Sequence, residues 1–387
     1  MKKRLVALTL AVVAVLSLLV PAASAASPIN LLIDGKKVIP TVDPVVENGT
    51  TLVPLRVISE TLGADVTWEQ SKQQATIKTA AYTVVFTLGS KNYTVNGATK
   101  TLLLAPKAVN GSTLVPIRAF SEAIGATVNY NSATNTASVD YFTKMSGSLK
   151  ISGSTTLQPI TQAAADKLMS MNSGLSITVS GGGSGTGIKD AAAGTVNIGM
   201  SSRELTADEM KSLKVYPVAN DGIAIIVNPD NSVKDLTKDQ AAKIFLGEIK
   251  NWKDVGGNDA PIVVMTRETG SGTRATLEEM ILDKKSVVER ATPFASSTLI
   301  KQAVAKDKNA IGFDSIGFVD STVKAVSLDG KSATAATVIS GSYGMGRQLF
   351  CLTNGNASGL SAIFIDYLKT QDCQDNIVVK EGYVKLS

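Results

Sequence analysis

Gly181-Gly-Gly-Ser-Gly-Thr-Gly187 lies between a strand-like run, Leu175–Val179, and a helical pattern that begins near Ile188. Two more segments share its composition and its place between a strand and a helix, Gly153-Ser-Thr-Thr156 and Thr269-Gly-Ser-Gly-Thr273. A helix N-terminus offers unpaired N–H groups and a partial positive charge, glycine lets the backbone approach a ligand, and hydroxyls add donors. One such loop is equally an ordinary cap or turn. Three in one domain predict an oxyanion site.

The residues around these loops predict an α/β domain with a mainly parallel sheet, because strand, loop and helix alternate from Leu149 onward. The domain runs over residues 149–387, which is too long for one simple sheet, so we expect two lobes. Ligands bind at the carboxyl ends of the strands in such sheets. The spacing is wrong for nucleotides, since no Gly-Lys-Ser/Thr ends the first loop and Thr186 occupies the third glycine position of a dinucleotide site.

Two charged residues accompany the predicted anion site. Arg267 precedes the third loop, where its guanidinium can make paired contacts with a tetrahedral anion, although a surface pair with Glu268 is the alternative. Asp221 heads an apolar strand, and a carboxylate repels an anion unless one of them carries a proton. Asp221 is therefore either outside the site or accepts a hydrogen bond from a protonated ligand oxygen, which would select monohydrogen phosphate over sulfate.

The N-terminal part contains a duplication. Asn48-Gly-Thr-Thr-Leu-Val-Pro-Leu-Arg56 returns 62 residues later as Asn110-Gly-Ser-Thr-Leu-Val-Pro-Ile-Arg118. Each copy predicts a turn, a strand, a helix beginning near the proline, a glycine stop and an alternating strand pair. Residues 28–142 are therefore expected to form a small α+β unit. The arginine and glutamate of each copy are best explained as an ion pair and a helix cap within the module.

Composition limits the chemistry and the location. The 387 residues include no histidine, which excludes a Ser-His-Asp triad and histidine-liganded metal sites, so binding is favoured over catalysis. Residues 1–25 combine Lys2-Lys-Arg4, an apolar run and Ala23-Ser-Ala25, the pattern of a cleaved secretory signal. Without those basic residues the formal charge falls from +5 to +2, which makes nucleic-acid binding through a basic field a poor prediction.

The order of the motifs over residues 149–387 resembles the phosphate-binding proteins of bacterial high-affinity phosphate import systems. The motifs are Gly153-Ser-Thr-Thr-Leu-Gln-Pro159, Gly183-Ser-Gly-Thr-Gly187, Ile198-Gly-Met-Ser-Ser-Arg203, Asp221-Gly-Ile, Arg267-Glu-Thr-Gly-Ser-Gly-Thr273, Ile311-Gly-Phe and Gly382-Tyr-Val. This resemblance implies a two-lobed periplasmic-binding-protein fold of the second type, which grips inorganic phosphate and delivers it to the permease subunits of an ABC transporter. By position, it implies a phosphate site made of Thr155, Thr156, Ser184, Ser202, Asp221, Arg267, Ser271, Gly272 and Thr273.

The resemblance also predicts boundaries and one departure. One lobe is expected at residues 149–227 and 312–387 and the other at 228–311, with the hinge near Asn228 and Gly312. Some family members have an aspartate where this chain has Ser202, so we infer that Asp221 takes the proton-accepting role. The duplicated module, residues 26–145, resembles the stalk-like domain named after the N-terminal region of copper amine oxidases. Without a histidine it cannot build that enzyme's copper site, so only a spacer or envelope contact is implied.

We therefore expect a secreted or cell-surface phosphate receptor that is a monomer, has no cofactor, metal or catalytic residue, and binds no nucleic acid. A receptor for another oxyanion, a phosphoester hydrolase on the same anion cradle and a wall-associated surface protein are the alternatives. The signal segment ends without a lipid-accepting cysteine, so the module is expected to contact a cell-wall polymer instead. Cys351 and Cys373 could be bridged outside the cell, but Cys351 lies in an apolar run and is equally a core residue.

Charge within the expected binding domain is balanced. Residues 148–387 carry 25 basic and 25 acidic groups, so selectivity must come from local dipoles and hydrogen bonds rather than from a basic field. Since the chain has no histidine, pH dependence near neutrality is expected to reflect the proton of the ligand itself.

Overall fold

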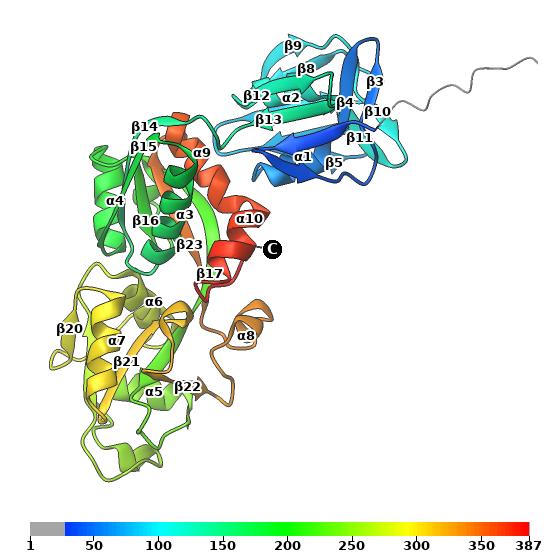
Figure 1. The fold of residues 1–387 in the computed structure, drawn as a ribbon. Coiled ribbons are helices and arrows are strands. Elements are labelled where there is room, and N and C mark those ends of the chain that lie inside the picture. Colours follow the sequence, from blue (N-terminus) through cyan, green and yellow to red (C-terminus); the bar gives the residue numbers. More distant parts are fainter. Residues whose placement is uncertain (1–27, 387) are drawn as a thin grey trace, which may run out of the picture.

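The computed structural model describes residues 28–386, and the predicted signal segment, residues 1–25, lies outside them. The N-terminal domain, drawn in blue to cyan in Figure 1, consists of three sheets. The first has the order β12 (Thr127–Asn131), β13 (Thr136–Asp140), β1 (Asn30–Ile33) and β2 (Lys36–Val38). The second has the order β10 (Lys107–Val109), β11 (Ser112–Pro116), β4 (Thr50–Pro54) and β3 (Val45–Glu47). The third has the order β5 (Asp65–Glu69), β6 (Gln74–Lys78), β7 (Thr83–Thr87), β8 (Asn92–Val95) and β9 (Ala98–Thr101).

The duplication is confirmed element by element. In both copies the helix starts directly after the repeated proline, as α1 (Leu55–Thr61) and α2 (Ile117–Ala123). The antiparallel pair β5–β6 of the first copy corresponds to β12–β13 of the second. The repeated charges form exposed ion pairs one helical turn apart, Arg56 with Glu60 and Arg118 with Glu122. The predicted ion pair within each module is therefore confirmed. The predicted helix cap is wrong, because neither helix has a side-chain hydrogen bond at its N-cap.

The second domain is built on a single 10-stranded sheet. Its main path is β15 (Gly174–Gly182), β14 (Ser146–Gly153), β16 (Ile198–Ser201), β23 (Gly346–Asn354), β17 (Leu213–Val227), β21 (Ala310–Ser315), β19 (Val263–Arg267) and β20 (Thr292–Phe294), with β22 (Lys324–Leu328) and β18 (Asp235–Leu236) off that path. The outer strands pair in parallel, as expected, but β17 and β23 run antiparallel to their neighbours. The sheet is mixed because these two strands pass through its centre.

Helices cover the sheet in two groups, which form the two lobes in Figure 1. The first lobe carries α3 (Gln158–Met171), α4 (Ser184–Ala193), α9 (Gly359–Lys369) and α10 (Gln371–Cys373), followed by a π-helical turn (Gln374–Val378). The second lobe carries α5 (Lys238–Phe245), α6 (Gly272–Met280), α7 (Ser297–Lys306) and α8 (Ala335–Ile339). Short 3₁₀ turns occupy Glu209–Lys211, Trp252–Val255 and Ile316–Phe318.

The lobes meet at a different place from the expected one. Along β17, Ala219 packs in the core of the first lobe and Ile223 in that of the second. Phe313 of β21 and Val326 of β22 also pack against the second-lobe core. The return to the first lobe is therefore at β23 rather than at Gly312, because these strands bury their apolar side chains with the second-lobe helices.

The join between the domains is packed rather than loose. Tyr141 and Phe142 are buried, their rings lie 4.9 Å apart, and Phe142 meets Tyr367 of α9 edge-on at 5.3 Å. One hydrophobic core runs from the N-terminal sheets through these rings into the first lobe. At Gly63 a side chain has no room, because a Cβ would lie 2.0 Å from the carbonyl oxygen of Asp366. The two domains are thus in direct backbone contact.

Asp366 of α9 is the polar centre of this junction. It is fully buried, and its carboxylate accepts hydrogen bonds from the Tyr141 hydroxyl at 2.8 Å and the Ala80 amide at 2.7 Å. Lys369 and Asp65 form an ion pair nearby, at 2.7 Å. Burial raises the pKa of Asp366 to about 7 in spite of the two hydrogen bonds. A protein carboxyl that is remote from the predicted anion site is therefore expected to titrate near neutrality and to make folding stability depend on pH.

The two cysteines are not bridged. Cys351 of β23 and Cys373 of α10 are both free and buried in the core that includes the first lobe. Burial raises the pKa of both thiols, that of Cys373 to about 12, so neither forms a thiolate readily. Each behaves as a small core residue. Within residues 28–386, no helix has the length and apolarity needed to cross a membrane.

Asp366→Asn is expected to remove a pH dependence of stability. The folded pKa of about 7 lies above the unfolded value near 4, so the contribution of Asp366 is complete below pH 4 and is lost as the pH rises through 7. The slope is at most about 1.4 kcal/mol per pH unit. Asparagine can still accept from the Ala80 amide. Urea denaturation at pH 5 and pH 7.5 checks this, and equal slopes for the two proteins would contradict it.

Candidate anion-binding site

The first lobe contributes hydroxyls from three strand ends on the same edge of the sheet. Thr155 and Thr156 follow β14, Ser184 begins α4 after β15, and Ser202 follows β16. The Ser184 hydroxyl accepts a hydrogen bond from the Ser202 amide at 3.0 Å, and their two hydroxyl oxygens lie 3.3 Å apart. All four residues are buried. Parallel strands that end together therefore gather them, as the loops predicted.

The glycine-rich loop after β15 is shorter than the sequence indicates. β15 continues to Gly182 and α4 already begins at Ser184, so only Gly183 separates strand from helix. Gly182 and Gly183 have φ values of +131° and +86°, which only glycine adopts readily and which turn the chain within two residues. Ser184 thus occupies the first turn of α4, where the free N–H groups of the helix lie.

The second lobe contributes the end of β19 and the N-terminus of α6. The hydroxyl of Ser271 caps α6 by accepting from the Arg274 amide at 3.3 Å. Gly272 must be glycine, because a Cβ there would lie 2.3 Å from the Ser184 Oγ and 2.6 Å from the Ser202 Oγ. The start of α6 is therefore pressed against the hydroxyls of the other lobe.

Several hydrogen bonds hold the lobes closed over the site. The Thr156 and Thr273 hydroxyl oxygens lie 3.0 Å apart, and the Gly185 amide donates to the Gly270 carbonyl at 2.9 Å. The Arg267 Nη2 donates to the Thr155 Oγ1 at 3.0 Å. Because both lobes supply partners, a ligand enters only when these bonds open.

Arg267 is a buried residue of the cleft. Only 1% of it is exposed, and it also donates to the Ser297 hydroxyl and to the carbonyls of Phe294 and Ala295. The alternative of a surface pair with Glu268 is wrong. Burial lowers the pKa of Arg267 below the usual value of a guanidinium, and the carboxylate of Asp314 opposes that shift. The guanidinium of Arg267 remains positively charged, and the hydroxyl and carbonyl oxygens that accept its hydrogen bonds hold it in place.

A second arginine, Arg347 of β23, was missed by sequence reasoning. Its guanidinium donates to the Thr273 Oγ1 at 3.1 Å and to the Ser202 carbonyl at 3.0 Å. It also forms a paired contact with the Asp221 Oδ2, at 2.7 and 2.9 Å. A carboxylate inside the apolar strand β17 requires a counter-ion. The sequence therefore indicated that a cation lies near Asp221. The partner could not be chosen without the register that places Asp221 opposite Arg347.

Two buried carboxylates balance the two arginines. Asp221 is fully engaged in the pair with Arg347 and in a hydrogen bond from the Ser315 hydroxyl at 2.6 Å, although burial raises its pKa. Asp314 accepts from the Ser315 amide through Oδ1. Within the described chain, its Oδ2 forms no hydrogen bond of standard geometry, and the neighbouring Ser297 hydroxyl lowers the pKa of the carboxyl. Burial raises the pKa of Asp314 to about 6, so it is mostly ionised at neutral pH.

The structure brings all nine residues that the sequence singled out into this buried cluster. They are Thr155, Thr156, Ser184, Ser202, Asp221, Arg267, Ser271, Gly272 and Thr273. Both carboxylate oxygens of Asp221 already accept hydrogen bonds, Oδ1 from the Ser315 hydroxyl and Oδ2 from Arg347, and the role of Asp221 as the acceptor of a ligand proton stays a prediction. The cluster is rich in donors and has balanced side-chain charge. Among residues 28–386, no three or more Cys, Asp and Glu side chains are grouped to hold a metal ion.

Two domain families match this chain. Residues 131–371 match the PBP superfamily domain, and residues 32–139 match the copper amine oxidase N-terminal domain. The second range corresponds to the N-terminal domain in Figure 1, and the first covers most of the second domain but also includes β13 of the N-terminal one. The first match covers more than half of the chain.

Individual relatives agree with the domain families. A phosphate-binding protein PstS from Bacillus subtilis is 42% identical over 248 residues, which are 63% of this chain and 82% of that protein. A putative phosphate ABC transporter substrate-binding protein from Clostridium perfringens, solved with bound phosphate, shares 39% identity and a TM-score of 0.60, covering 62% of this chain and all of that one. An ABC-type phosphate transport receptor from Vibrio cholerae shares 34% identity and a TM-score of 0.53, covering 62% of this chain and 100% of that one.

The two-lobed sheet, the closed cluster of donors and the relatives lead to one assignment. The chain belongs to the PBP superfamily, in the family of phosphate-binding proteins named PstS, and carries a copper amine oxidase N-terminal domain in front of its binding domain.

Proposed function

We propose that this chain captures inorganic phosphate between its two lobes and delivers it to the permease of an ABC transporter. The observation that carries the proposal is the closed cleft, in which two buried guanidinium groups, Arg267 and Arg347, meet hydroxyls from both lobes. The N-termini of α4 and α6 add backbone donors, because each begins among these hydroxyls. Donors on both sides of one small anion would favour the closed state over the open one.

Binding without chemistry fits the same residues. The cleft contains no histidine and no free thiol, and the hydroxyls of Thr156 and Thr273 contact each other and Arg347 rather than a general base. The relatives are named as binding and transport proteins. A phosphoester hydrolase would need a nucleophile activated by a base or a metal. We therefore assign the chain a receptor role.

Selectivity for phosphate requires an acceptor for the ligand proton. The charges of Arg267 and Arg347 are balanced by Asp221 and Asp314, so the cleft distinguishes anions through hydrogen bonds rather than net charge. We assign the acceptor role to Asp314 rather than Asp221, because both oxygens of Asp221 already accept hydrogen bonds, whereas Asp314 Oδ2 has none of standard geometry and lies within the electrostatic reach of Arg267. Monohydrogen phosphate can donate to it, whereas sulfate has no proton to donate at neutral pH.

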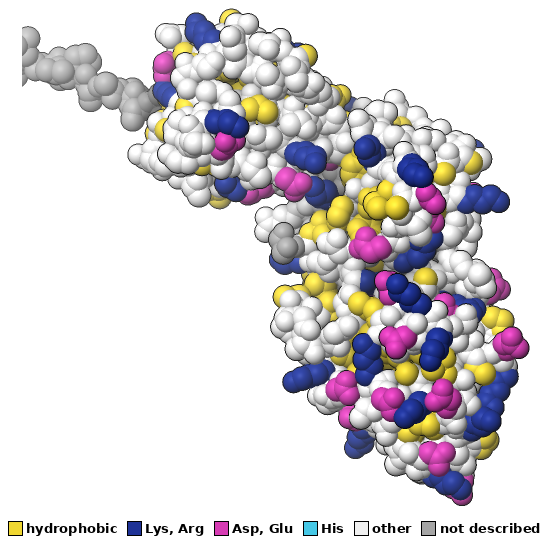
Figure 2. Space-filling model, turned by 180° about the vertical axis from the view of Figure 1, so that it is seen from behind, with side chains coloured by type: hydrophobic (Ala, Val, Ile, Leu, Met, Phe, Trp, Pro, Cys, Tyr) yellow, Lys and Arg dark blue, Asp and Glu magenta, His cyan; other side chains and the backbone are white. Residues whose placement is uncertain are grey.

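The same proposal includes location and partners. An exported, monomeric receptor held at the cell surface would explain an N-terminal domain that packs rigidly on the first lobe and leaves the second lobe untouched (Figure 1). Lysines, arginines and acidic residues are interspersed on the face of both lobes in Figure 2, which argues against nucleic acid as a partner. The partners that we propose are the membrane permease and, for the N-terminal domain, a cell-wall polymer.

Arg267→Ala is expected to weaken phosphate binding by about 1.5 to 3 kcal/mol, because a charged hydrogen-bond donor is lost. Isothermal calorimetry measures the change. Arg290→Ala is the matched control, since Arg290 is an exposed arginine of the same lobe. Circular dichroism verifies the fold of both variants, and an unchanged dissociation constant for a folded Arg267→Ala would contradict the assignment.

Asp314→Asn is expected to let sulfate compete with phosphate, whereas sulfate should fail to compete with the unmodified protein even in large excess. The amide removes the acceptor that separates the two anions. Asp221→Asn is the control, because Asp221 contacts Arg347 instead; it should weaken phosphate binding and leave sulfate excluded. Competition calorimetry at pH 7.5 distinguishes these outcomes. Continued exclusion of sulfate by Asp314→Asn would overturn the role of Asp314.

A further inference from the structure

The N-terminal domain contains a pocket that is unrelated to the anion cleft. It has a volume of about 580 Å³, within the range of about 300–1,000 Å³ that is typical of small-molecule sites. One side is formed by α1 and the β5–β6 hairpin of the first repeat, and the other by the turn between β10 and β11 of the second. The duplication thus creates a pocket between its two copies.

The pocket has an apolar floor and a polar rim. Leu55 and Ala75 are buried beneath it, with the half-buried Val57 and Val66 beside them. Trp68 stands at the rim with 37% of its surface exposed, while Trp252, the other tryptophan, is only 2% exposed in the second lobe. An aromatic ring held at the edge of an apolar cavity is a ready platform for a flat, partly apolar ligand face.

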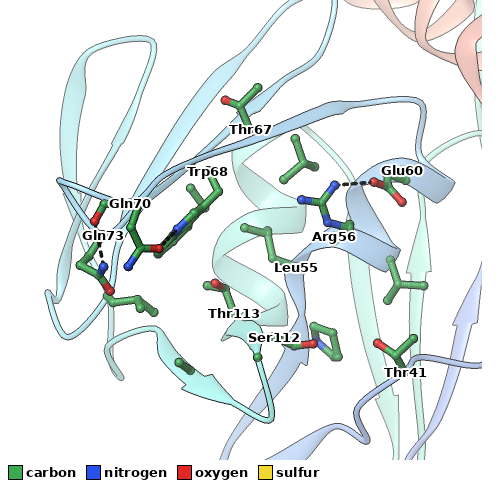
Figure 3. A pocket seen from close by; sticks show the side chains of 17 residues that line it. Thr41, Leu55, Arg56, Glu60, Thr67, Trp68, Gln70, Gln73, Ser112 and Thr113 are labelled. Carbon is green, nitrogen blue, oxygen red and sulfur yellow. Dashed lines mark hydrogen bonds and ion pairs between the residues drawn. The ribbon is translucent and has the colours of Figure 1, made fainter. Parts of the chain in front are cut away.

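Neutral hydrogen-bonding groups surround the tryptophan. The Trp68 indole N–H donates to the Gln70 Oε1 at 2.7 Å, which fixes that carboxamide beside the ring. Within residues 28–386, the lining hydroxyls have no hydrogen-bond partner; they are those of Thr41, Thr67, Ser112 and Thr113. Figure 3 shows Trp68 and Gln70 on one side of the pocket, with Ser112 and Thr113 between them and Arg56.

The charges of the pocket cancel. Arg56 and Glu60 are its charged lining residues, and they pair with each other at 3.0 Å on the side opposite Trp68 (Figure 3). A charged ligand would have to break that pair and finds no net attraction. A ligand that offers apolar C–H faces together with many hydroxyls matches both the ring and the rim. That combination is the chemistry of a neutral sugar.

The second repeat provides an internal comparison. At the position of Trp68 it has Tyr130, whose hydroxyl donates to the Asn135 Oδ1 at 2.6 Å, and at the position of Gln70 it has Ser132. Both aromatic residues thus donate to a carboxamide of their own repeat, but the carboxamide of the second repeat is five residues away rather than two. Of the two repeats, the first alone has a tryptophan that is followed two residues later by a glutamine.

We propose that the pocket around Trp68 binds a neutral oligosaccharide, with a sugar ring stacked on the indole and its hydroxyls bonded to Gln70 and the lining threonines. This inference deepens the proposed attachment to the cell surface and rests on that part of the proposed function, not on phosphate binding. An extended peptide, paired with the edge strand β5, is the competing occupant.

Calorimetry of the purified chain with chitotetraose and cellotetraose tests the proposal, with penta-alanine as the peptide probe. Saturable binding of either tetrasaccharide is expected, together with a change in fluorescence, because Trp68 is the exposed tryptophan. Trp68→Ala should weaken the binding at least about tenfold. Tyr130→Ala, which removes the corresponding aromatic residue of the second repeat, should leave it unchanged.

Phosphate is titrated into the same samples, so that a failure of the saccharide proposal can be distinguished from a failure of the proposed phosphate binding. Loss of sugar binding with intact phosphate binding locates the sugar site at Trp68, and a circular-dichroism melting curve like that of the unmodified protein verifies that the N-terminal domain of the variant is folded. No heat with either sugar at millimolar concentration, equal affinity in Trp68→Ala, or binding of penta-alanine alone would overturn the saccharide assignment. Failure of phosphate binding alone would leave it standing.

Discussion

The buried ion pair between Asp221 and Arg347 is the interaction on which the binding domain depends. It lies where β17 and β23 cross from one lobe to the other, and the two residues face each other in the strand register. A shift of that register would leave two charges unpaired in the core, which costs several kcal/mol. The pair therefore fixes how the lobes are connected. It also delivers Arg347 to the hydroxyls of the cleft, so one contact serves both connection and site.

Charge balance then sets the character of the cleft. Two arginines and two aspartates cancel, which leaves helix N-termini and hydroxyls to define which anion fits. Such a cleft does not rely on a long-range field, consistent with the equal numbers of basic and acidic groups in residues 148–387. Titration near neutrality comes instead from buried carboxyls. Burial raises the pKa of Asp314 to about 6 and that of Asp366 to about 7.

The junction gives the molecule its second organising contact. Asp366, Tyr141 and Gly63 bring the N-terminal domain against α9 with a continuous hydrophobic core. The N-terminal domain therefore moves with the first lobe, while the second lobe remains free of it (Figure 1). Closure of the cleft can then occur without disturbing the domain that carries the Trp68 pocket. The Trp68 pocket and the anion-binding cluster thus lie in separate domains.

The sequence by itself determined the repeat and the α/β class, because glycine-rich caps and repeated motifs are local patterns that survive without coordinates. The nine residues that lie together in the buried cluster were singled out by the order of the motifs, which resembles that of a known family. Only the tertiary structure decided what depends on pairing between distant segments. Arg347 lies 126 residues from Asp221, and only the register of two strands brings them together. The lobe boundary moved because Phe313 packs with the second-lobe core, and Cys351 and Cys373 are separate core residues. The pocket at Trp68 arises between two repeats, so its lining could not be read from either copy alone.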